Sequence, residues 1–190
     1  STLSGTTSNI VFQFASHLVC ANVGDSRGIL VYDKNPKLSS SNIFALSHDH
    51  KPDLPDAYKR IISMGGTVKK LTDKNGVEIG GPLRVWKGQE NYPGLAMSRS
   101  LGDMHAKSCG VIPVPQIEEY TLNETTRYIA ICSDGVWEFL SNDQVKTIGN
   151  PYYIQDDILG HCQNLILSAM KMWEKNDIIR DDITAVIVYF

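Results

Sequence analysis

The chain contains several short, nearly uninterrupted apolar runs, and three of them meet an aspartate at one end. Asp25 follows LVCANVG, Asp134 follows YIAICS, and Asp181 and Asp182 precede ITAVIVYF. Runs of this length that are rich in β-branched residues are typical of buried β-strands. The sequence therefore predicts a fold built largely on β-sheets, with acidic residues where strands begin or end.

Two interpretations of these aspartates remain open at this point. Aspartate is common in turns, so each acid could simply border its strand. Alternatively, the strand ends converge at one rim of a sheet, where clustered carboxylates would repel one another unless a cation neutralised them. Oxygen-only ligands favour hard ions, Mg²⁺ or Mn²⁺, over zinc. The spacing of the acids does not distinguish the two interpretations.

The first half of the chain divides into a β-rich part and a polar insertion. Residues 8–33 hold three β-rich runs separated by polar residues and by Gly24-Asp25, which predicts an antiparallel meander. LPDAYKRIISMGG, residues 54–66, predicts one short helix, and Asn75-Gly76 predicts a hairpin turn. Residues 49–97 are thus expected to form a helix-plus-hairpin insertion.

The second half reads as strand, helix and strand. RYIAICSDGVWEFL, residues 127–140, predicts a buried strand that runs into a turn, and the final DDITAVIVYF predicts a central-type strand. Residues 157–176 predict an amphipathic helix, in which we expect His161 to be exposed or hydrogen-bonded. The expected apolar stripe of that helix comprises Ile158, Leu159, Cys162, Leu165, Ile166, Ala169 and Met170.

Composition excludes several classes of protein. With 190 residues, 42% of them hydrophobic, and a net charge of −3, the chain can form one soluble domain or a large part of one. It has neither the basic character expected of a nucleic-acid-binding protein nor an apolar window long enough to span a membrane. The four dispersed cysteines indicate a reduced, intracellular protein, cytoplasmic or nuclear. The opening without an initiator methionine, close to a strand-like run, indicates a piece of a longer protein.

A family resemblance emerges when the motifs are taken in order. They are SGTTSN, ANVGDSRGILV, LSHDHKP, RIISMGGTV, RVW, PGLAMSRSLGD, VIPVPQIEEY, CSDGVWEFLSNDQV and DDITAVIVY, and they run over nearly the whole chain. The series closely resembles the metal-dependent protein serine/threonine phosphatases of the PP2C type. RVW followed by a short insert and PGLAMSRSLGD is most similar to the branch of that family found in plants and protists.

The resemblance implies an α+β fold, an α/β/β/α sandwich of two antiparallel sheets flanked by helices and incomplete at its N-terminus. Residues 1–190 would be the C-terminal portion of a single phosphatase domain, and residues 49–97 would correspond to the variable flap beside the active site. Removing the N-terminal part should bare strand edges, so we expect a strand-completing partner chain or a swapped oligomer for the isolated chain.

The resemblance also implies a two-metal site for Mg²⁺ or Mn²⁺. Asp134 and Asp181 match metal ligands of the family, and Asp25 matches an acid associated with a weaker additional metal. Asp182 stands where the family usually has Asn, and Asp181 is favoured because it aligns without a gap before Ile183-Thr184. Glu138 falls where the family commonly has Asp. The remaining ligands, the phosphate-binding arginine and the acid histidine have no counterpart in this chain, and His48 and His50 are interpreted as loop and turn residues.

The implied activity is hydrolysis of phosphoserine and phosphothreonine in proteins by a metal-activated water, with no covalent enzyme intermediate. Because part of the metal site is missing, the isolated chain is expected to be inactive. The alternative, from a different class, is a non-catalytic module that keeps the sandwich for binding or regulation. The retained acids Asp25, Asp134 and Asp181 favour the enzyme.

Overall fold

The computed structural model describes residues 4–33, 41–176 and 180–190. The chain divides into two compact units. Unit 1 comprises Ser1–Ser8, Asn22–Asp25 and Asp49–Gln116, and unit 2 comprises Asn9–Ala21, Ser26–His48 and Ile117–Phe190. Among the described residues, no helix is long and apolar enough to cross a membrane.

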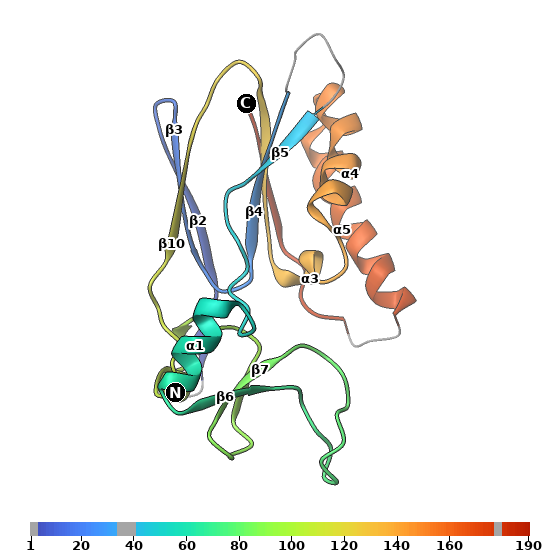
Figure 1. Ribbon diagram of the computed structural model, residues 1–190. Helices are drawn as coiled ribbons and strands as arrows, with labels where there is room; N and C mark the ends of the chain where they lie inside the picture. The colour runs from blue at the N-terminus through green and yellow to red at the C-terminus, as the bar shows by residue number, and fades with distance from the viewer. Residues whose placement is uncertain (1–3, 34–40, 177–179) are drawn as a thin grey trace. The chain divides into compact units, whose positions relative to one another are not determined.

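Two antiparallel sheets form the centre of unit 2 (Figure 1). One has the order β10-β3-β2, from β10 (Gln116–Thr121), β3 (His17–Val23) and β2 (Ser8–Phe14). The other has the order β12-β11-β4-β5, from β12 (Ala185–Tyr189), β11 (Thr126–Cys132), β4 (Arg27–Asp33) and β5 (Ser41–Ala45). Apolar side chains from both sheets share one cluster, which includes Leu18 and Cys20 of β3, Leu30 of β4 and Ile129 of β11. The two sheets therefore pack face to face.

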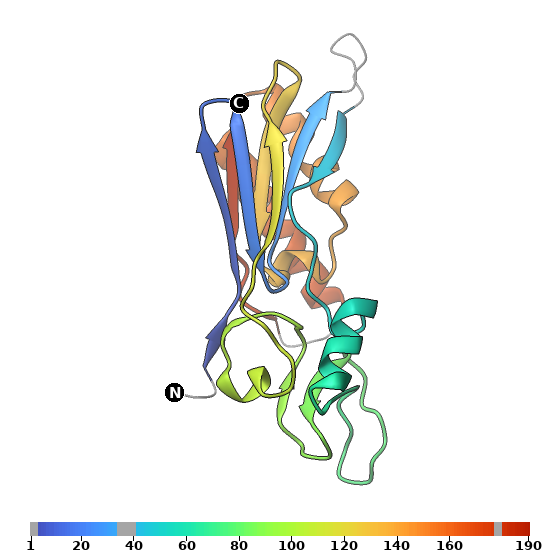
Figure 2. The same ribbon diagram turned by 60° about the vertical axis from the view of Figure 1, so that its left-hand side comes forward.

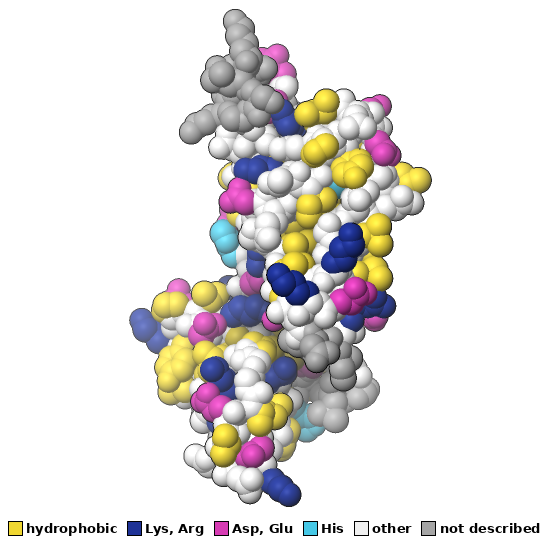
Figure 3. All heavy atoms as spheres, turned by 90° about the vertical axis from the view of Figure 1, so that its right-hand side faces the viewer, with side chains coloured by type: hydrophobic (Ala, Val, Ile, Leu, Met, Phe, Trp, Pro, Cys, Tyr) yellow, Lys and Arg dark blue, Asp and Glu magenta, His cyan; other side chains and the backbone are white. Residues whose placement is uncertain are grey.

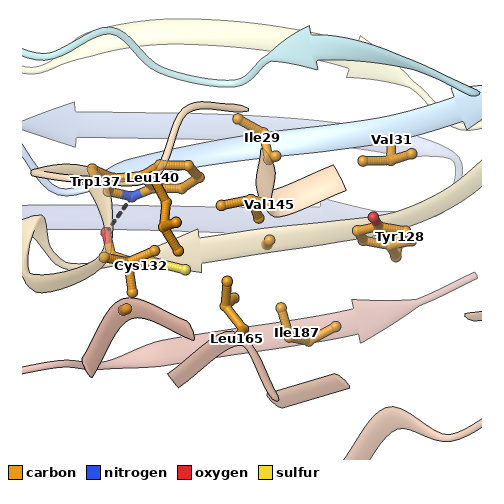
Figure 4. Packing of buried hydrophobic residues seen from close by; sticks show 12 residues of the cluster. Ile29, Val31, Tyr128, Cys132, Trp137, Leu140, Val145, Leu165 and Ile187 are labelled. Carbon is orange, nitrogen blue, oxygen red and sulfur yellow. Dashed lines mark hydrogen bonds between the residues drawn. The ribbon is translucent and has the colours of Figure 1, made fainter. Parts of the chain in front are cut away.

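Two helices cover the other face of the β12-β11-β4-β5 sheet (Figure 1). They are α4 (Asn142–Ile154) and α5 (Ile158–Lys175). The larger core lies between this sheet and these helices, and Figure 4 shows side chains from strands and helices meeting there. Its buried members are Ile29, Val31, Tyr128, Ala130, Cys132, Val136, Trp137, Leu140, Val145, Leu165, Ala169 and Ile187. The mixed class and the paired antiparallel sheets agree with the predicted α+β sandwich.

The predicted meander over residues 8–33 is wrong. β2 and β3 pair as expected, but β4 belongs to the other sheet, where its neighbours are β5 and β11. The chain changes sheets at the turn that contains Gly24, whose φ of 103° lies in the region that favours glycine. A turn signal in the sequence marks where a strand ends but does not say which strand the next one will join.

The final strand also differs from its prediction. β12 was expected to be central, but in the part of the chain that the structure describes it pairs only with β11 and lies at the sheet edge. Its side chains alternate, with Ile187 buried and Val186 and Val188 exposed. The run of apolar residues therefore reflects two different faces and not burial on both sides.

The helical predictions were right in position and partly wrong in detail. The predicted helix at 157–176 is α5, but its buried residues are His161, Leu165, Ala169 and Trp173, spaced by four, while Leu159 is exposed. Helix α4 was not predicted. Its N-terminus carries a capping box, in which Ser141 and Gln144 exchange backbone and side-chain hydrogen bonds.

Unit 1 contains the predicted short helix as α1 (Pro55–Ser63) and a three-stranded sheet of order β6-β7-β8. These strands are Gly66–Lys69, Arg84–Lys87 and Pro93–Leu95, and the long loop between β6 and β7 carries Asn75-Gly76 (Figure 2). The predicted hairpin turn is therefore confirmed. Beside its tip, Thr72 and Glu78 form a β-bridge, and Asp73 N donates to Val77 O at 2.8 Å. The unit also holds β1 (Gly5–Thr6), which pairs with β9 (Leu101–Gly102), and α2 (Met104–Lys107).

Some apolar side chains of unit 2 remain on its surface. On the outer helical layer, apolar side chains are interleaved with Lys and Arg (Figure 3). On edge strand β2, Ile10, Phe12 and Phe14 are exposed, the last by 82%. Within the described part of unit 2, no helix covers the outer face of the β10-β3-β2 sheet.

Candidate metal-binding site

The candidate site begins where β11 ends and β12 starts. Cys132 and Ala185 are paired across these strands. Just beyond this pair, Ser133 N donates to Thr184 O at 3.0 Å, and Thr184 N donates to Ser133 Oγ at 3.0 Å. Ser133 Oγ in turn donates to Asp182 O at 3.2 Å. One serine therefore fastens the turn that carries Asp134 to the segment that carries Asp181 and Asp182.

A close backbone approach strengthens this connection. A Cβ on Gly135 would lie 2.3 Å from Asp182 O, so only glycine lets the two segments come this close. Asp134 starts the short helix α3 (Asp134–Trp137), and its side chain is half-buried. The Asp-Gly pair thus has two separate tasks: aspartate presents a carboxylate and glycine permits the contact behind it.

Two tryptophans hold the turn from the core side. Trp137 Nε1 lies 2.9 Å from Cys132 O, the hydrogen bond drawn in Figure 4, and 3.0 Å from Arg27 O, so it donates to both carbonyls. Trp173 Nε1 on α5 donates to Gly135 O at 2.7 Å. Trp137 itself is a buried member of the larger core. Such fixed backbone geometry is what a ligand turn requires.

The second acidic segment is more exposed. Asp181 and Asp182 are both exposed, and Asp181 Oδ1 accepts a 2.8 Å hydrogen bond from Asp182 N. That bond orients the Asp181 carboxylate, while the backbone of Asp182 is used by Ser133 and by the contact with Gly135. The structure therefore brings the predicted ligands Asp134 and Asp181 to the same end of the β11–β12 pair.

The donors at this site are oxygen atoms. Among the described residues, no three His, Cys, Asp or Glu side chains are grouped closely enough to hold a metal ion. Burial raises the pKa of the neighbouring Cys132 thiol well above its ordinary value, so this thiol is protonated at neutral pH and is not a thiolate ligand. Glu138 is exposed one turn after Asp134, and its N–H donates to Asp134 O at 2.8 Å. The chemistry fits a hard divalent cation, and the described residues supply part of a ligand set.

The third predicted residue, Asp25, belongs to unit 1. Its side chain is 7% exposed, and its Oδ2 lies 2.6 Å from Lys51 Nζ. The preceding Gly24 exchanges two hydrogen bonds with His50: Gly24 N donates to Nδ1 and His50 N donates to Gly24 O, both at 3.0 Å. Asn22 Nδ2 adds a third bond to Gly24 O at 3.3 Å. The residue directly before Asp25 is thus held by three hydrogen bonds.

His50 is a structural residue in this arrangement. Because Nδ1 accepts a hydrogen bond from a backbone N–H, its proton is on Nε2, which is buried without a partner among the described residues. Burial, together with the charge of Arg99, lowers the pKa of His50 to about 4. The prediction that His50 is a loop and turn residue agrees with this geometry. The role of Lys51 was not predicted.

The family model described as Protein phosphatase 2C matches residues 1–176. The chain belongs to the protein phosphatase 2C family. This confirms the resemblance that the ordered motifs carried.

Relatives in plants support the same assignment. The chain is 40% identical over 145 residues to probable protein phosphatase 2C 12 of Oryza sativa. This match covers 76% of the chain and 36% of the relative. It is 33% identical over 191 residues to probable protein phosphatase 2C 34 of Arabidopsis thaliana, covering 98% of this chain and 50% of the relative. The chain therefore spans about half the length, or less, of these protein phosphatase 2C relatives.

Solved structures support the fold. A serine-threonine phosphatase 2C from Toxoplasma gondii superposes with a TM-score of 0.82 at 24% identity, over 97% of this chain and 58% of that one. A C. elegans sex determining protein superposes with a TM-score of 0.69 at 17% identity, over 92% of this chain and 37% of that one. At these identities the likeness shows the protein phosphatase 2C fold alone.

Proposed function

We propose that the complete protein is a metal-dependent protein serine/threonine phosphatase that uses Mg²⁺ or Mn²⁺ and acts on phosphoserine and phosphothreonine in proteins. One observation carries the proposal: Ser133 and Gly135 fasten the Asp134 turn to the Asp181-Asp182 segment. Two simple turn formers would not need this shared anchoring. Membership of the protein phosphatase 2C family agrees with it.

The residues of this chain would hold the metal and keep its ligands in place. Asp134 and Asp181 would bind it through carboxylate oxygens, and Asp25 would serve a weaker additional site. When bound, the metal supplies positive charge that neutralises a phosphoryl group and makes a water molecule more acidic. Trp137 and Trp173 keep the Asp134 turn from relaxing, because both donate to carbonyls of that turn. None of these steps requires a nucleophilic side chain.

The chain would act as the C-terminal portion of a phosphatase domain, with residues 49–97 as its flap. Since its described residues supply only part of a ligand set, we expect the isolated chain to be inactive. The rest of the domain, or a partner that adds strands at the edges β2 and β12, would complete it. The four cysteines are free thiols, which supports an intracellular location, cytoplasmic or nuclear.

The test is Asp134→Asn in the complete protein. We expect phosphate release from a phosphoserine peptide in Mn²⁺ to fall by more than about a hundredfold. Mutating even a residue that only hydrogen-bonds to a metal ligand lowers metal affinity or activity by about 10- to 100-fold. The matched control is Asp143→Asn, which removes the same charge from a carboxylate that is 80% exposed on α4. It should leave turnover unchanged.

The outcome also separates the two functional classes. Turnover in Asp134→Asn equal to that of the wild type would show that Asp134 only forms a turn. A wild-type protein that binds substrate peptide but releases no phosphate in Mg²⁺ or Mn²⁺ would favour the non-catalytic binding module.

A further inference from the structure

The ion pair between Asp25 and Lys51 joins two unequal partners. The carboxylate is 7% exposed, whereas the Lys51 side chain is 32% exposed. A buried carboxylate is stable only with a partner that offsets the loss of hydration, and here a 2.6 Å charge-assisted contact provides it. Lys51 is therefore the cation that accompanies Asp25 in this structure.

The two partners also differ in freedom of movement. Asp25 sits in a turn whose glycine is held by three hydrogen bonds, two from the exchange with His50 and one from Asn22. The backbone of His50 is anchored in turn, since Ser98 N donates to His50 O at 2.7 Å. Lys51 carries its ammonium on a flexible four-carbon stem that reaches solvent. The Asp25 carboxylate is thus held in place, whereas the Lys51 ammonium is able to move away into solvent.

We propose that Lys51 is an internal counter-ion that a divalent cation must displace from Asp25, so that Lys51 sets the affinity of this position for metal. An ammonium and a divalent ion repel each other at contact distance, and Oδ2 cannot serve both. A metal ion that binds Asp25 therefore has to break the ion pair and move the ammonium to solvent. The inference rests on the proposed function only in taking Asp25 as a metal-binding residue.

The first experiment measures metal binding by the complete protein and not activity. In Lys51→Met, Mg²⁺ binding followed by calorimetry should gain affinity at the weakest site by roughly ten- to a hundredfold, the range that hydrogen bonds to charged groups contribute. The double variant Asp25→Asn/Lys51→Met should lose this gain. Lys51→Arg, which keeps the charge, should bind Mg²⁺ much more like the wild type than Lys51→Met does. Lys59→Met, which removes an exposed lysine from α1, should match the wild type.

A second measurement uses the wild-type protein, so it decides the matter even if Lys51→Met does not fold. The NMR signal of the Lys51 ammonium, identified by its absence in Lys51→Arg, should move to the position of a solvated lysine as Mg²⁺ is added. Unchanged Mg²⁺ affinity in folded Lys51→Met, or a Lys51 signal that saturating Mg²⁺ leaves in place, would overturn the proposal. If the protein is an active phosphatase but shows one of these two results, only the inference about Lys51 is overturned. If Mg²⁺ displaces Lys51 but the protein has no phosphatase activity, only the proposed function is refuted.

Discussion

A buried histidine makes the stability of unit 2 depend on pH. His161 on α5 is fully buried and is enclosed by aromatic rings from three other elements. Its Nδ1 lies 3.1 Å from Tyr189 Oη, and the Tyr128 ring meets it edge-on at 4.9 Å between centroids. Its Nε2 has no hydrogen-bond partner among the described residues. Burial lowers the pKa of His161 from 6.5 to about 4.

The sign and size of the effect follow from these two pKa values. The folded state has the lower pKa, so between the two values the unfolded state binds more protons, and acid favours unfolding. The contribution of His161 is fully present above about pH 6.5, falls as the pH drops, and stops changing below about pH 4. The free energy of unfolding changes by roughly 1.4 kcal/mol per pH unit between the two pKa values. It therefore falls by about 3 kcal/mol between about pH 6.5 and about pH 4, and about 2 kcal/mol of this is lost by about pH 5.

The assay is denaturant unfolding of the complete protein in EDTA at about pH 8 and about pH 5, with the wild type and His161→Gln compared. Between about pH 8 and about pH 5, the free energy of unfolding of the wild type should fall by about 2 kcal/mol more than that of the variant. His17→Gln, at an exposed position, should behave as the wild type. Equal pH dependence in wild type and His161→Gln would refute the reasoning, as would an NMR titration that placed the pKa of His161 near 6.5.

Four further predictions concern two glycines and the isolated chain. Gly149→Ala should destabilise the protein by about 1–3 kcal/mol in denaturant unfolding, because its Cβ would lie 2.3 Å from His161 Nε2; stability equal to the wild type would contradict this packing. Gly135→Ala should weaken Mn²⁺ binding in calorimetry, since its Cβ would push Asp182 O away, and unchanged binding would count against the anchoring. The isolated 190-residue chain should show negligible hydrolysis of p-nitrophenyl phosphate in Mn²⁺, and robust turnover would overturn that expectation. The isolated chain should also self-associate through β2, where Phe12 and Phe14 are exposed, and light scattering measures this. A stable monomer would show that these two side chains do not drive association.

Features set by neighbours in sequence could be predicted. The strand before Asp134 follows from its apolar run, and the turn follows from Asp-Gly. Helix α1 follows from its Pro-Asp start and Gly-Gly end. Helix α4 could also have been found, because Ser141 and Gln144 have the spacing of a capping box, but the helix has few apolar residues in a regular stripe.

The buried face of α5 shows why apolar content alone misleads. The predicted stripe included Leu159, which is exposed, and left out His161, which is fully buried. A histidine is accepted there because Tyr189 provides a hydrogen-bond partner and Gly149 leaves space for the ring. Tyr189 and Gly149 lie on other elements, so the sequence of the helix alone could not indicate that His161 is buried and Leu159 is exposed.

The grouping of Asp134 with Asp181 depends on contacts that no local pattern encodes. The pairing of Cys132 with Ala185 places the two acidic segments at the same end of adjacent strands, and a shift of one residue would turn every side chain of β12 to the opposite face. Ser133 and Gly135 then select Asp182 for its backbone carbonyl, while Asp181 is oriented by the N–H of Asp182. Two adjacent aspartates therefore make different contacts only once the sheet has formed. The choice of Asp181 over Asp182 as a metal ligand comes from the alignment of motifs in the sequence and stays a prediction.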